Sequence, residues 1–224
     1  MTLAKPINKY IDYIDAPEDT FEQYVEKALK YDFRCVFANL QEYATGRAML
    51  EGSDIILAGA IDFPQGTMTL EEKLARFEEY AACGFTEIDY VLNQESVENR
   101  DFDAIEHEMT TIADFCRERG ITDKVIVEMC KLDGDDVAKR RVCEIALEAK
   151  PGFLKTSTGR SFGGAKLQDV QLMREVLGDA VAIKAAGGIH NYEEALAFIE
   201  AGASALGASA GIAIVEGAPE DERR

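Results

Sequence analysis

Gly152-Phe-Leu-Lys-Thr-Ser-Thr-Gly159 is the stretch from which the fold of this chain is best approached. It begins as a short apolar run typical of a buried strand, places Lys155 at the end of that run, and continues into small hydroxylated residues and glycine. In a parallel α/β protein the C-terminal ends of the strands face the ligand, so Lys155 would point its amine toward a binding site. The alternative is a lysine that merely extends from a strand end into solvent.

Apolar or β-rich runs recur along the whole chain and alternate with segments of helical spacing. The runs fall at residues 10–14, 35–38, 56–61, 87–92, 124–128, 153–156, 181–185 and 205–208. Helical spacing is clear after Thr69, where Leu70, Leu74 and Phe77 recur among charged residues. Strands that alternate with helices imply right-handed crossovers and a parallel sheet, and the number of units predicts a single-domain (β/α)8 TIM barrel. An open doubly wound sheet is the alternative.

Helix-end signals support this pattern. Thr69 followed by Glu72 has the spacing of a capping box, and Gly84 stands where a left-handed residue would end the helix. Asn191 and Glu194 repeat the signal near the C-terminus. The other predicted helices span residues 18–31, 41–50, 101–119, 135–150 and 166–177.

Length and composition fit one folded domain. The chain has 224 residues, and α/β barrels commonly reach about 200–250 residues as a single domain. We expect one domain over residues 1–224, with a short polar tail from about residue 217. Hydrophobic residues make up 47% and charged residues 29% of the chain, which is typical of a folded protein. The formal charge of −18 would repel a phosphate backbone, so we expect neither nucleic acid nor a membrane as partner.

Cysteine usage and hydropathy indicate the compartment. The five cysteines are widely spaced and include no Cys-x-x-Cys pair, which argues against a disulfide framework or a zinc site. The N-terminus lacks a long apolar segment, and no apolar run approaches the roughly 18 residues of a membrane span. We therefore expect a cytoplasmic enzyme or binding protein.

Two more polar residues lie near the ends of predicted strands. Lys184 lies in Val181-Ala-Ile-Lys-Ala-Ala-Gly-Gly-Ile189, and Asp89 in Glu87-Ile-Asp-Tyr-Val-Leu92. In a barrel, Lys155, Lys184 and Asp89 would face one cavity. Schiff-base catalysis needs such a group, because a lysine attacks a carbonyl only as the free amine and its unperturbed pKa is about 10.4.

The neighbours of Lys155 would supply the required chemistry. Desolvation and the charge of Lys184 would both lower the pKa of Lys155. Asp89 together with Lys184 could move protons during carbinolamine formation and C–C cleavage. Asp89 could equally be a structural acid that holds Lys184 in place.

Glycine-rich segments follow the last two predicted strands. They are Gly187-Gly188 and Gly207-Ala-Ser209-Ala-Gly211. Phosphate sites in barrels often use the last two strand-to-helix loops, where backbone N–H groups favour an anion. A single glycine pair is more often a simple turn, but two such loops on adjacent strands favour phosphate binding.

Other chemistries lack their motifs. The chain contains no Gly-x-Gly-x-x-Gly or Walker-type loop. Its two histidines, His107 and His190, have no nucleophile-elbow sequence nearby. Glu128, at the end of a predicted strand, is either a site residue or a buried acid paired with a lysine.

These residues, taken in order, resemble the deoxyribose-phosphate aldolase family over nearly the whole chain. The motifs that carry the resemblance are Phe63-Pro-Gln-Gly66, Glu87-Ile-Asp89, Val125-Ile-Val-Glu128, Lys155-Thr-Ser-Thr-Gly159 and Lys184-Ala-Ala-Gly-Gly-Ile189. The resemblance implies a class I aldolase that cleaves 2-deoxy-D-ribose 5-phosphate to acetaldehyde and D-glyceraldehyde 3-phosphate, with no metal or other cofactor. It also implies a homodimer or homotetramer that binds a small sugar phosphate or aldehyde.

The resemblance assigns roles to single residues. Lys155 would be the Schiff-base lysine, Lys184 the lysine that perturbs it, and Asp89 the proton-relay acid. The residues on the substrate and phosphate side would be Thr158, Gly159, Gly187, Gly188 and Ser209.

Several positions depart from the family pattern. The first strand typically contains Asp-His-Thr-Leu-Leu-Lys-Pro, whereas this chain has Asp12-Tyr13-Ile14-Asp15-Ala16-Pro17. Phe37 stands where many members have cysteine, His190 where arginine is common, and Ala210 where a second serine is usual. The last two changes remove a fixed positive charge and a hydroxyl donor, so phosphate affinity should fall. A Schiff-base aldolase for a different or non-phosphorylated aldehyde, and a non-catalytic phosphosugar-binding barrel, are the alternatives.

Overall fold

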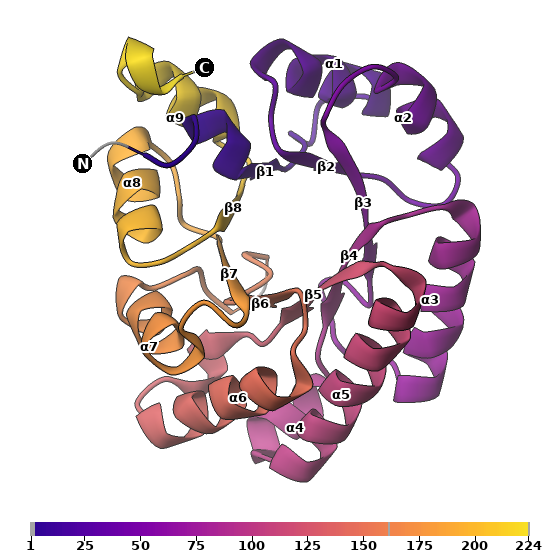
Figure 1. Ribbon diagram of the computed structural model, residues 1–224, viewed down its shortest axis with the longest axis vertical. Coiled ribbons are helices and arrows are strands. Elements are labelled where there is room, and N and C mark those ends of the chain that lie inside the picture. Colours follow the sequence, from indigo (N-terminus) through magenta and orange to yellow (C-terminus); the bar gives the residue numbers. More distant parts are fainter. Residues whose placement is uncertain (1–2, 161, 224) are drawn as a thin grey trace.

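The protein is a closed parallel barrel (Figure 1). The structure is a computed structural model that describes residues 3–160 and 162–223; residues 1, 2 and 224, at the two ends of the expected domain and its polar tail, and residue 161 lie outside the described residues. The strands are β1 (Ile11–Tyr13), β2 (Cys35–Phe37), β3 (Ile56–Ile61), β4 (Glu87–Val91), β5 (Thr122–Ile126), β6 (Phe153–Lys155), β7 (Ala182–Ala186) and β8 (Ala205–Ala208). The pairing of β1 with β8 closes the sheet, which confirms the (β/α)8 prediction and excludes the open sheet.

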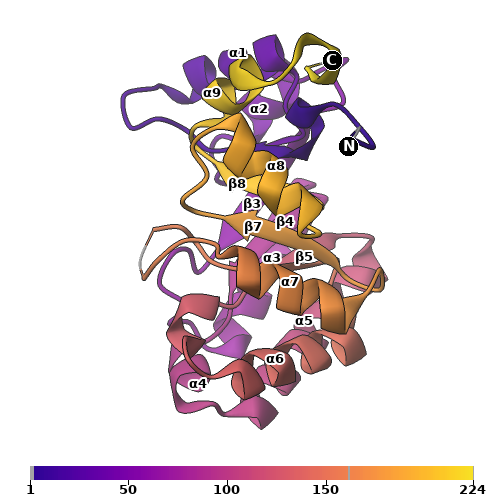
Figure 2. The ribbon, with the colours of Figure 1, turned by 90° about the vertical axis from the view of Figure 1, so that its left-hand side faces the viewer.

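Helices surround the barrel, and α7 and α8 lie over β7 and β8 in the side view (Figure 2). The helices are α1 (Phe21–Tyr31), α2 (Tyr43–Met49), α3 (Leu70–Cys83), α4 (Gln94–Asn99), α5 (Phe102–Arg119), α6 (Asp136–Ala149), α7 (Leu167–Leu177), α8 (Tyr192–Glu200) and α9 (Gly211–Gly217). Single 3-10 turns lie at η1 (Ile7–Tyr10), η2 (Met129–Leu132) and η3 (Glu220–Glu222). Within residues 3–160 and 162–223, no helix is both long enough and apolar enough to cross a bilayer.

The capping box predicted at Thr69 and Glu72 is present, with each side chain accepting a hydrogen bond from the other residue's backbone N–H. Thr20 and Gln23 form the same reciprocal pair at the start of α1. The helix therefore begins at Phe21 instead of the predicted residue 18.

The bounds of β5 differ from the prediction by two residues. The strand spans Thr122–Ile126, and Glu128 lies beyond its end with φ of +64°, in the left-handed region. Asp123 concealed the start of the strand, because charged residues are rare inside buried strands. The short α4 escaped prediction because its six residues span fewer than two helical turns.

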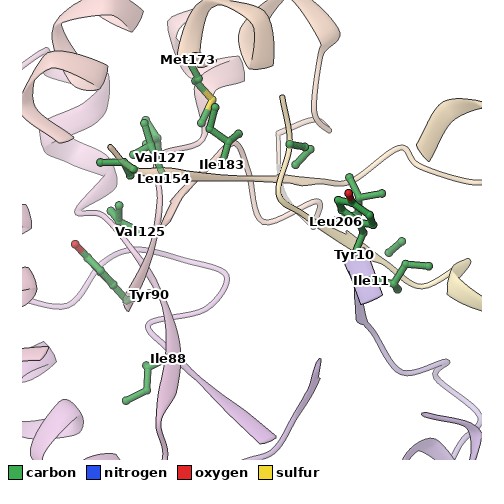
Figure 3. Close-up of a cluster of buried hydrophobic side chains, with 14 of the residues drawn as sticks. Tyr10, Ile11, Ile88, Tyr90, Val125, Val127, Leu154, Met173, Ile183 and Leu206 are labelled. Atoms are coloured by element: carbon green, nitrogen blue, oxygen red, sulfur yellow. The ribbon is translucent and has the colours of Figure 1, made fainter. Parts of the chain in front are cut away.

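The apolar core fills the layer between barrel and helices. Met173 of α7 lies beside Ile183 of β7, and Leu154 of β6 is close by (Figure 3). The side chains of all three are fully buried. Since these contacts seal the outer face of the sheet, the inward-facing positions can carry charged groups.

The carboxylate of Asp123 is buried, and its pKa reports how well this layer excludes water. One carboxylate oxygen accepts a hydrogen bond of 2.9 Å from the Gly152 N–H, and the other has no hydrogen-bond partner among the described residues. Burial raises the pKa of Asp123 to about 6. An unfolded aspartate titrates near 3.9, so the folded state binds the proton more tightly and the wild type loses stability as the pH rises between these values.

Asp123→Asn removes this penalty. The free energy of unfolding of the variant, minus that of the wild type, should increase by about 2 kcal/mol from pH 4 to pH 7. Urea unfolding at the two pH values measures the gain. A difference that does not change with pH would contradict the account.

Candidate active site

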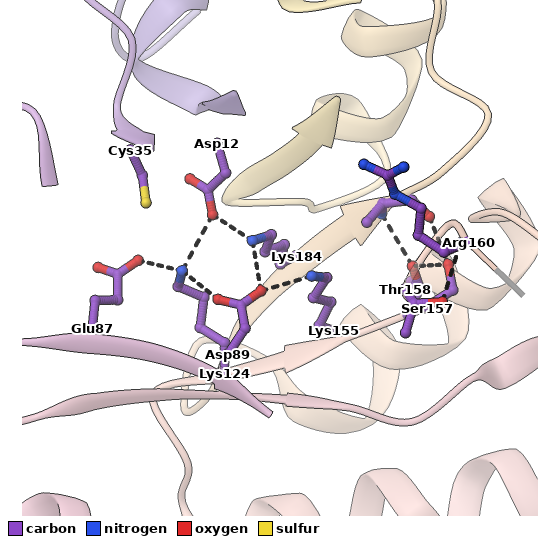
Figure 4. Close-up of polar contacts among 12 residues, drawn as sticks. Asp12, Cys35, Glu87, Asp89, Lys124, Lys155, Ser157, Thr158, Arg160 and Lys184 are labelled. Carbon is purple, nitrogen blue, oxygen red and sulfur yellow. Dashed lines mark hydrogen bonds and ion pairs between the residues drawn. The ribbon is translucent and has the colours of Figure 1, made fainter. Parts of the chain in front are cut away.

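The interior of the barrel carries a cluster of charged side chains (Figure 4). Its members are Asp12 of β1, Arg34 just before β2, Glu87 and Asp89 of β4, Lys124 of β5, Lys155 of β6 and Lys184 of β7. All except Arg34 are buried. Alternation along β4 puts Glu87 and Asp89 on the same side of the sheet. Gly207 of β8 packs closely against β7, because a Cβ there would lie 3.0 Å from Cβ of Ala186.

The three residues predicted to be catalytic lie together. One carboxylate oxygen of Asp89, Oδ2, is 2.6 Å from Nζ of Lys155 and 2.9 Å from Nζ of Lys184. The strand register sets Lys155 directly beside Lys184. A single carboxylate oxygen therefore contacts both lysines.

The other four members, Asp12, Arg34, Glu87 and Lys124, were not predicted from the sequence. Lys124 Nζ lies 2.6 Å from Oδ1 of Asp89 and 3.3 Å from Oδ2 of Asp12. Asp12 Oδ2 also lies 2.6 Å from Nζ of Lys184. The available signal was a charged residue inside an apolar strand run, but only the register, in which Asp89 is paired with Lys124, shows that the charges meet.

Further ion pairs anchor the cluster on the side away from Lys155. A guanidinium nitrogen of Arg34 lies 2.5 Å from Asp12 and 2.5 Å from Glu87. Glu87 is also 2.7 Å from Nζ of Lys124. Lys124 is thus in contact with three carboxylates. Such complete pairing is what a buried group of charges requires.

Charge balance distinguishes Lys155 from the other cations. Within the cluster, four cationic side chains face three carboxylates, and the ion pair of Lys155 is with Asp89. Burial lowers the pKa of Lys155 to about 8; the carboxylate of Asp89 opposes this effect and the charge of Lys184 adds to it. Against the effect of burial, the lysines hold the pKa of Asp89 well below its usual range. The cluster therefore makes the free amine of Lys155 easier to form than that of an ordinary lysine, beside an ionised Asp89.

Two glycine loops meet beside Lys155. Gly159 has φ of +70° and Gly187 has φ of +86°, both in the region that favours glycine. A Cβ on Gly159 would lie 2.9 Å from the Cα of Gly187, so the loops touch backbone to backbone. The hydroxyl of Ser157 donates a 2.6 Å hydrogen bond to the carbonyl of Ala186 and joins them further.

A cavity of about 830 Å³ opens over the cluster. Of the predicted site residues, its lining includes Asp89, Lys155, Thr158, Gly159, Gly187 and Ser209. Lys184 lies beneath it, bonded to Asp89. Gly188 and His190 are exposed and lie outside the lining formed by the described residues. Phe37 and Phe63 add aromatic walls, with ring centroids 4.8 Å from Nζ of Lys184 and 5.6 Å from Nζ of Lys155.

Arg160 also lines the cavity, although it was not among the predicted site residues. It directly follows Gly159, and its guanidinium lies 4.0 Å from the carboxylate of Asp15. The lining also contains four acidic residues, Asp15, Glu18, Asp19 and Glu42. The sequence shows an arginine directly after Gly159, but only the path of the loop determines that this side chain lies in the cavity lining.

Glu128 holds the β6–α7 loop. Its Oε1 accepts a 2.7 Å hydrogen bond from the Thr158 N–H and another from the Thr158 hydroxyl. Of the two interpretations of Glu128, the contacts favour a buried acid that supports the site, with Thr158 as a partner.

Potential metal ligands in the barrel are already engaged. Atoms of Asp12, Cys35 and Glu87 lie within 4.8 Å of one another. Both carboxylates are paired with Arg34 and Lys124, and burial raises the pKa of the Cys35 thiol, which disfavours the thiolate that metals bind. These side chains fit the ion cluster better than a metal centre.

Comparison with known proteins identifies the family. The chain is 40% identical over 204 residues to deoxyribose-phosphate aldolase of Lactobacillus acidophilus, covering 91% of this chain and 85% of the relative. It is 39% identical over 215 residues to deoxyribose-phosphate aldolase of Finegoldia magna, covering 94% and 99%. No family model matches the chain.

Solved structures point the same way. A tetrameric deoxyribose phosphate aldolase from Aeropyrum pernix matches with a TM-score of 0.81 and 26% identity, covering 94% of this chain and 89% of the other. Fold and sequence together place the chain among the (β/α)8-barrel lyases that act as aldolases. It belongs to the deoxyribose-phosphate aldolase family.

The lowered pKa of Lys155 gives a prediction that needs no substrate. Reductive alkylation of Lys155 by a small aldehyde should accelerate as the pH rises through about 8. Lys184→Met removes a neighbouring positive charge, which should move the midpoint to higher pH. Peptide mass spectrometry of Lys155 across a pH series measures both profiles. Lys30→Met, on the exposed surface of α1, is the matched control and should leave the midpoint in place; identical profiles for all three proteins would refute the role of Lys184.

Proposed function

We propose that this chain is a class I aldolase that cleaves 2-deoxy-D-ribose 5-phosphate to acetaldehyde and D-glyceraldehyde 3-phosphate. The observation that carries the proposal is the amine of Lys155, buried at the cavity floor with its pKa lowered to about 8. A pKa of this size leaves roughly a tenth of the amines free at pH 7, against far fewer for an unperturbed lysine. Family membership supports the choice of substrate.

The reaction begins at the aldehyde carbon of the open-chain sugar. Lys155 Nζ forms a bond to C1, and the resulting carbinolamine loses water to give a protonated imine. Asp89, in contact with both Lys155 and Lys184, is placed to take the proton from the attacking nitrogen and to return it to the departing hydroxyl.

Cleavage then breaks the C2–C3 bond. The C3 hydroxyl gives its proton to Asp89, its oxygen becomes the aldehyde of glyceraldehyde 3-phosphate, and the electron pair of the C2–C3 bond moves into the imine to form an enamine. Asp89 then returns this proton to C2. Protonation at C2 and hydrolysis of the imine release acetaldehyde and restore the amine of Lys155. Lys184, held 2.6 Å from Asp12, keeps a positive charge beside the reacting nitrogen.

The phosphate would lie at the glycine loops. Gly159 and Gly187 bring two backbone segments to one wall of the cavity, and Ser209 adds a hydroxyl. Thr158, whose hydroxyl donates to Glu128, would act by holding the loop. Arg160 supplies a cation on the same side, which would offset the loss of the arginine expected at position 190. Gly188 would act through the conformation of the loop, since it stands next to Gly187.

A second candidate is a related Schiff-base aldolase for a non-phosphorylated aldehyde. The acidic residues of the lining, Asp15, Glu18, Asp19 and Glu42, favour it because these charges repel a phosphate. The ratio of kcat/KM for deoxyribose 5-phosphate and deoxyribose separates the candidates. We also propose a homodimer or homotetramer, supported by the tetrameric relative from Aeropyrum pernix.

Borohydride trapping tests the principal proposal. Incubation with deoxyribose 5-phosphate and sodium borohydride should reduce the imine to a stable secondary amine on Lys155, located by peptide mass spectrometry. Lys155→Leu should abolish both the adduct and aldolase turnover, whereas Lys30→Met should retain both. An adduct confined to other lysines, or an active Lys155→Leu variant, would falsify the proposal.

A further inference from the structure

Asp15 and Arg160 form an ion pair across the mouth of the cavity. The nearest atoms of the carboxylate and the guanidinium are 4.0 Å apart. Asp15 belongs to the loop after β1 and Arg160 to the loop after β6, and these strands are not neighbours in the barrel. Both side chains line the cavity and are about half exposed. The pair therefore connects the loop after β1 to the loop that follows Lys155.

Arg160 is the cation that an incoming phosphate would meet first. Among the described residues of the lining, the lysines and arginines are Arg160 and the buried Lys155. Because Arg160 directly follows Gly159, it stands beside the proposed phosphate loops. A guanidinium binds either a carboxylate or a phosphate with the same donors, so the two anions compete for it.

Asp15 differs from its acidic neighbours in the lining. Asp19 is paired with Lys27 at 2.7 Å, and Glu42 accepts a 2.9 Å hydrogen bond from the Asn39 N–H. Asp15 instead contacts Arg160. Of these three acids, Asp15 is the one in contact with Arg160, the residue proposed to bind the phosphate.

We propose that Asp15 is a specificity-determining residue that competes with the substrate phosphate for Arg160; this inference rests on the proposed function. A phosphorylated aldehyde must displace Asp15 from the guanidinium and then lie near a carboxylate that repels it. A neutral aldehyde neither has to displace Asp15 nor is repelled by its carboxylate. Asp15 thus reduces the ratio of kcat/KM for phosphorylated over non-phosphorylated substrates, and this ratio depends on ionic strength.

Replacement of a single charge tests the competition. Asp15→Asn should raise kcat/KM for deoxyribose 5-phosphate about two- to fivefold, mainly through KM, because exposed pairs contribute modestly. Turnover of deoxyribose should change much less. Glu18→Gln, in the same loop, is the matched control and should have the smaller effect. The gain from Asp15→Asn should shrink as salt is raised from about 0.05 to about 0.5 M.

The partner residue supplies the decisive comparison. In an Arg160→Gln background, Asp15→Asn should lose most of its effect on KM for the phosphorylated substrate. An unchanged effect in that background, or equal changes for both substrates, would overturn the inference while leaving the aldolase assignment intact. Failure of the wild type to cleave deoxyribose 5-phosphate would overturn the proposed function, and this inference with it.

Discussion

The carboxylate of Asp89 is shared by Lys124, Lys155 and Lys184 in a space that solvent hardly reaches. Charges can remain in such a place only if they are paired and hydrogen-bonded, since burial of an isolated ion is costly. To meet this requirement, Asp89 of β4 and the lysines of β5, β6 and β7 must all point into the barrel. The cluster also leaves one cation more than the carboxylates can neutralise, and the pKa of Lys155, which lines the cavity, is lowered to about 8.

The surrounding fold serves this arrangement by separating two kinds of interior. Apolar side chains such as Met173 and Ile183 fill the layer under the helices, while the barrel axis holds the ions. Asp12 and Arg34 hold the far side of the cluster, so Lys184 has a fixed position beneath the cavity. Loss of one carboxylate would leave buried cations unpaired, which typically costs about 3–5 kcal/mol. Stability and reactivity therefore depend on the same contacts.

Much of this organisation could be predicted from the sequence. Periodicity and capping signals predicted the alternating strands and helices. The positions of Lys155, Lys184 and Asp89 near strand ends predicted that they face one cavity; in the structure Lys155 and Asp89 line it, and Lys184 lies beneath it in contact with Asp89. Lys124 was hidden because its charge made it look like the edge of a strand; its role depends on register, which pairs it with Asp89. A pattern along one strand carries no information about which residue of the next strand stands opposite.

Loop positions were harder to predict than strand positions. Gly187 lines the cavity while the adjacent Gly188 does not, and Arg160 faces the mouth while His190 stands outside the lining. The backbones of Gly159 and Gly187 also lie in close contact, although the two residues are far apart in the sequence. Neither loop's own sequence shows which residues of the other loop lie beside it.

The central claim is that burial in the ion cluster lowers the pKa of Lys155 to about 8. NMR titration of the lysine side-chain carbons, with Lys155 assigned by comparison with Lys155→Leu, measures its pKa in the resting protein. The account predicts a midpoint near 8, clearly separated from the surface lysines. A midpoint above 10, within the range of those surface lysines, would contradict it.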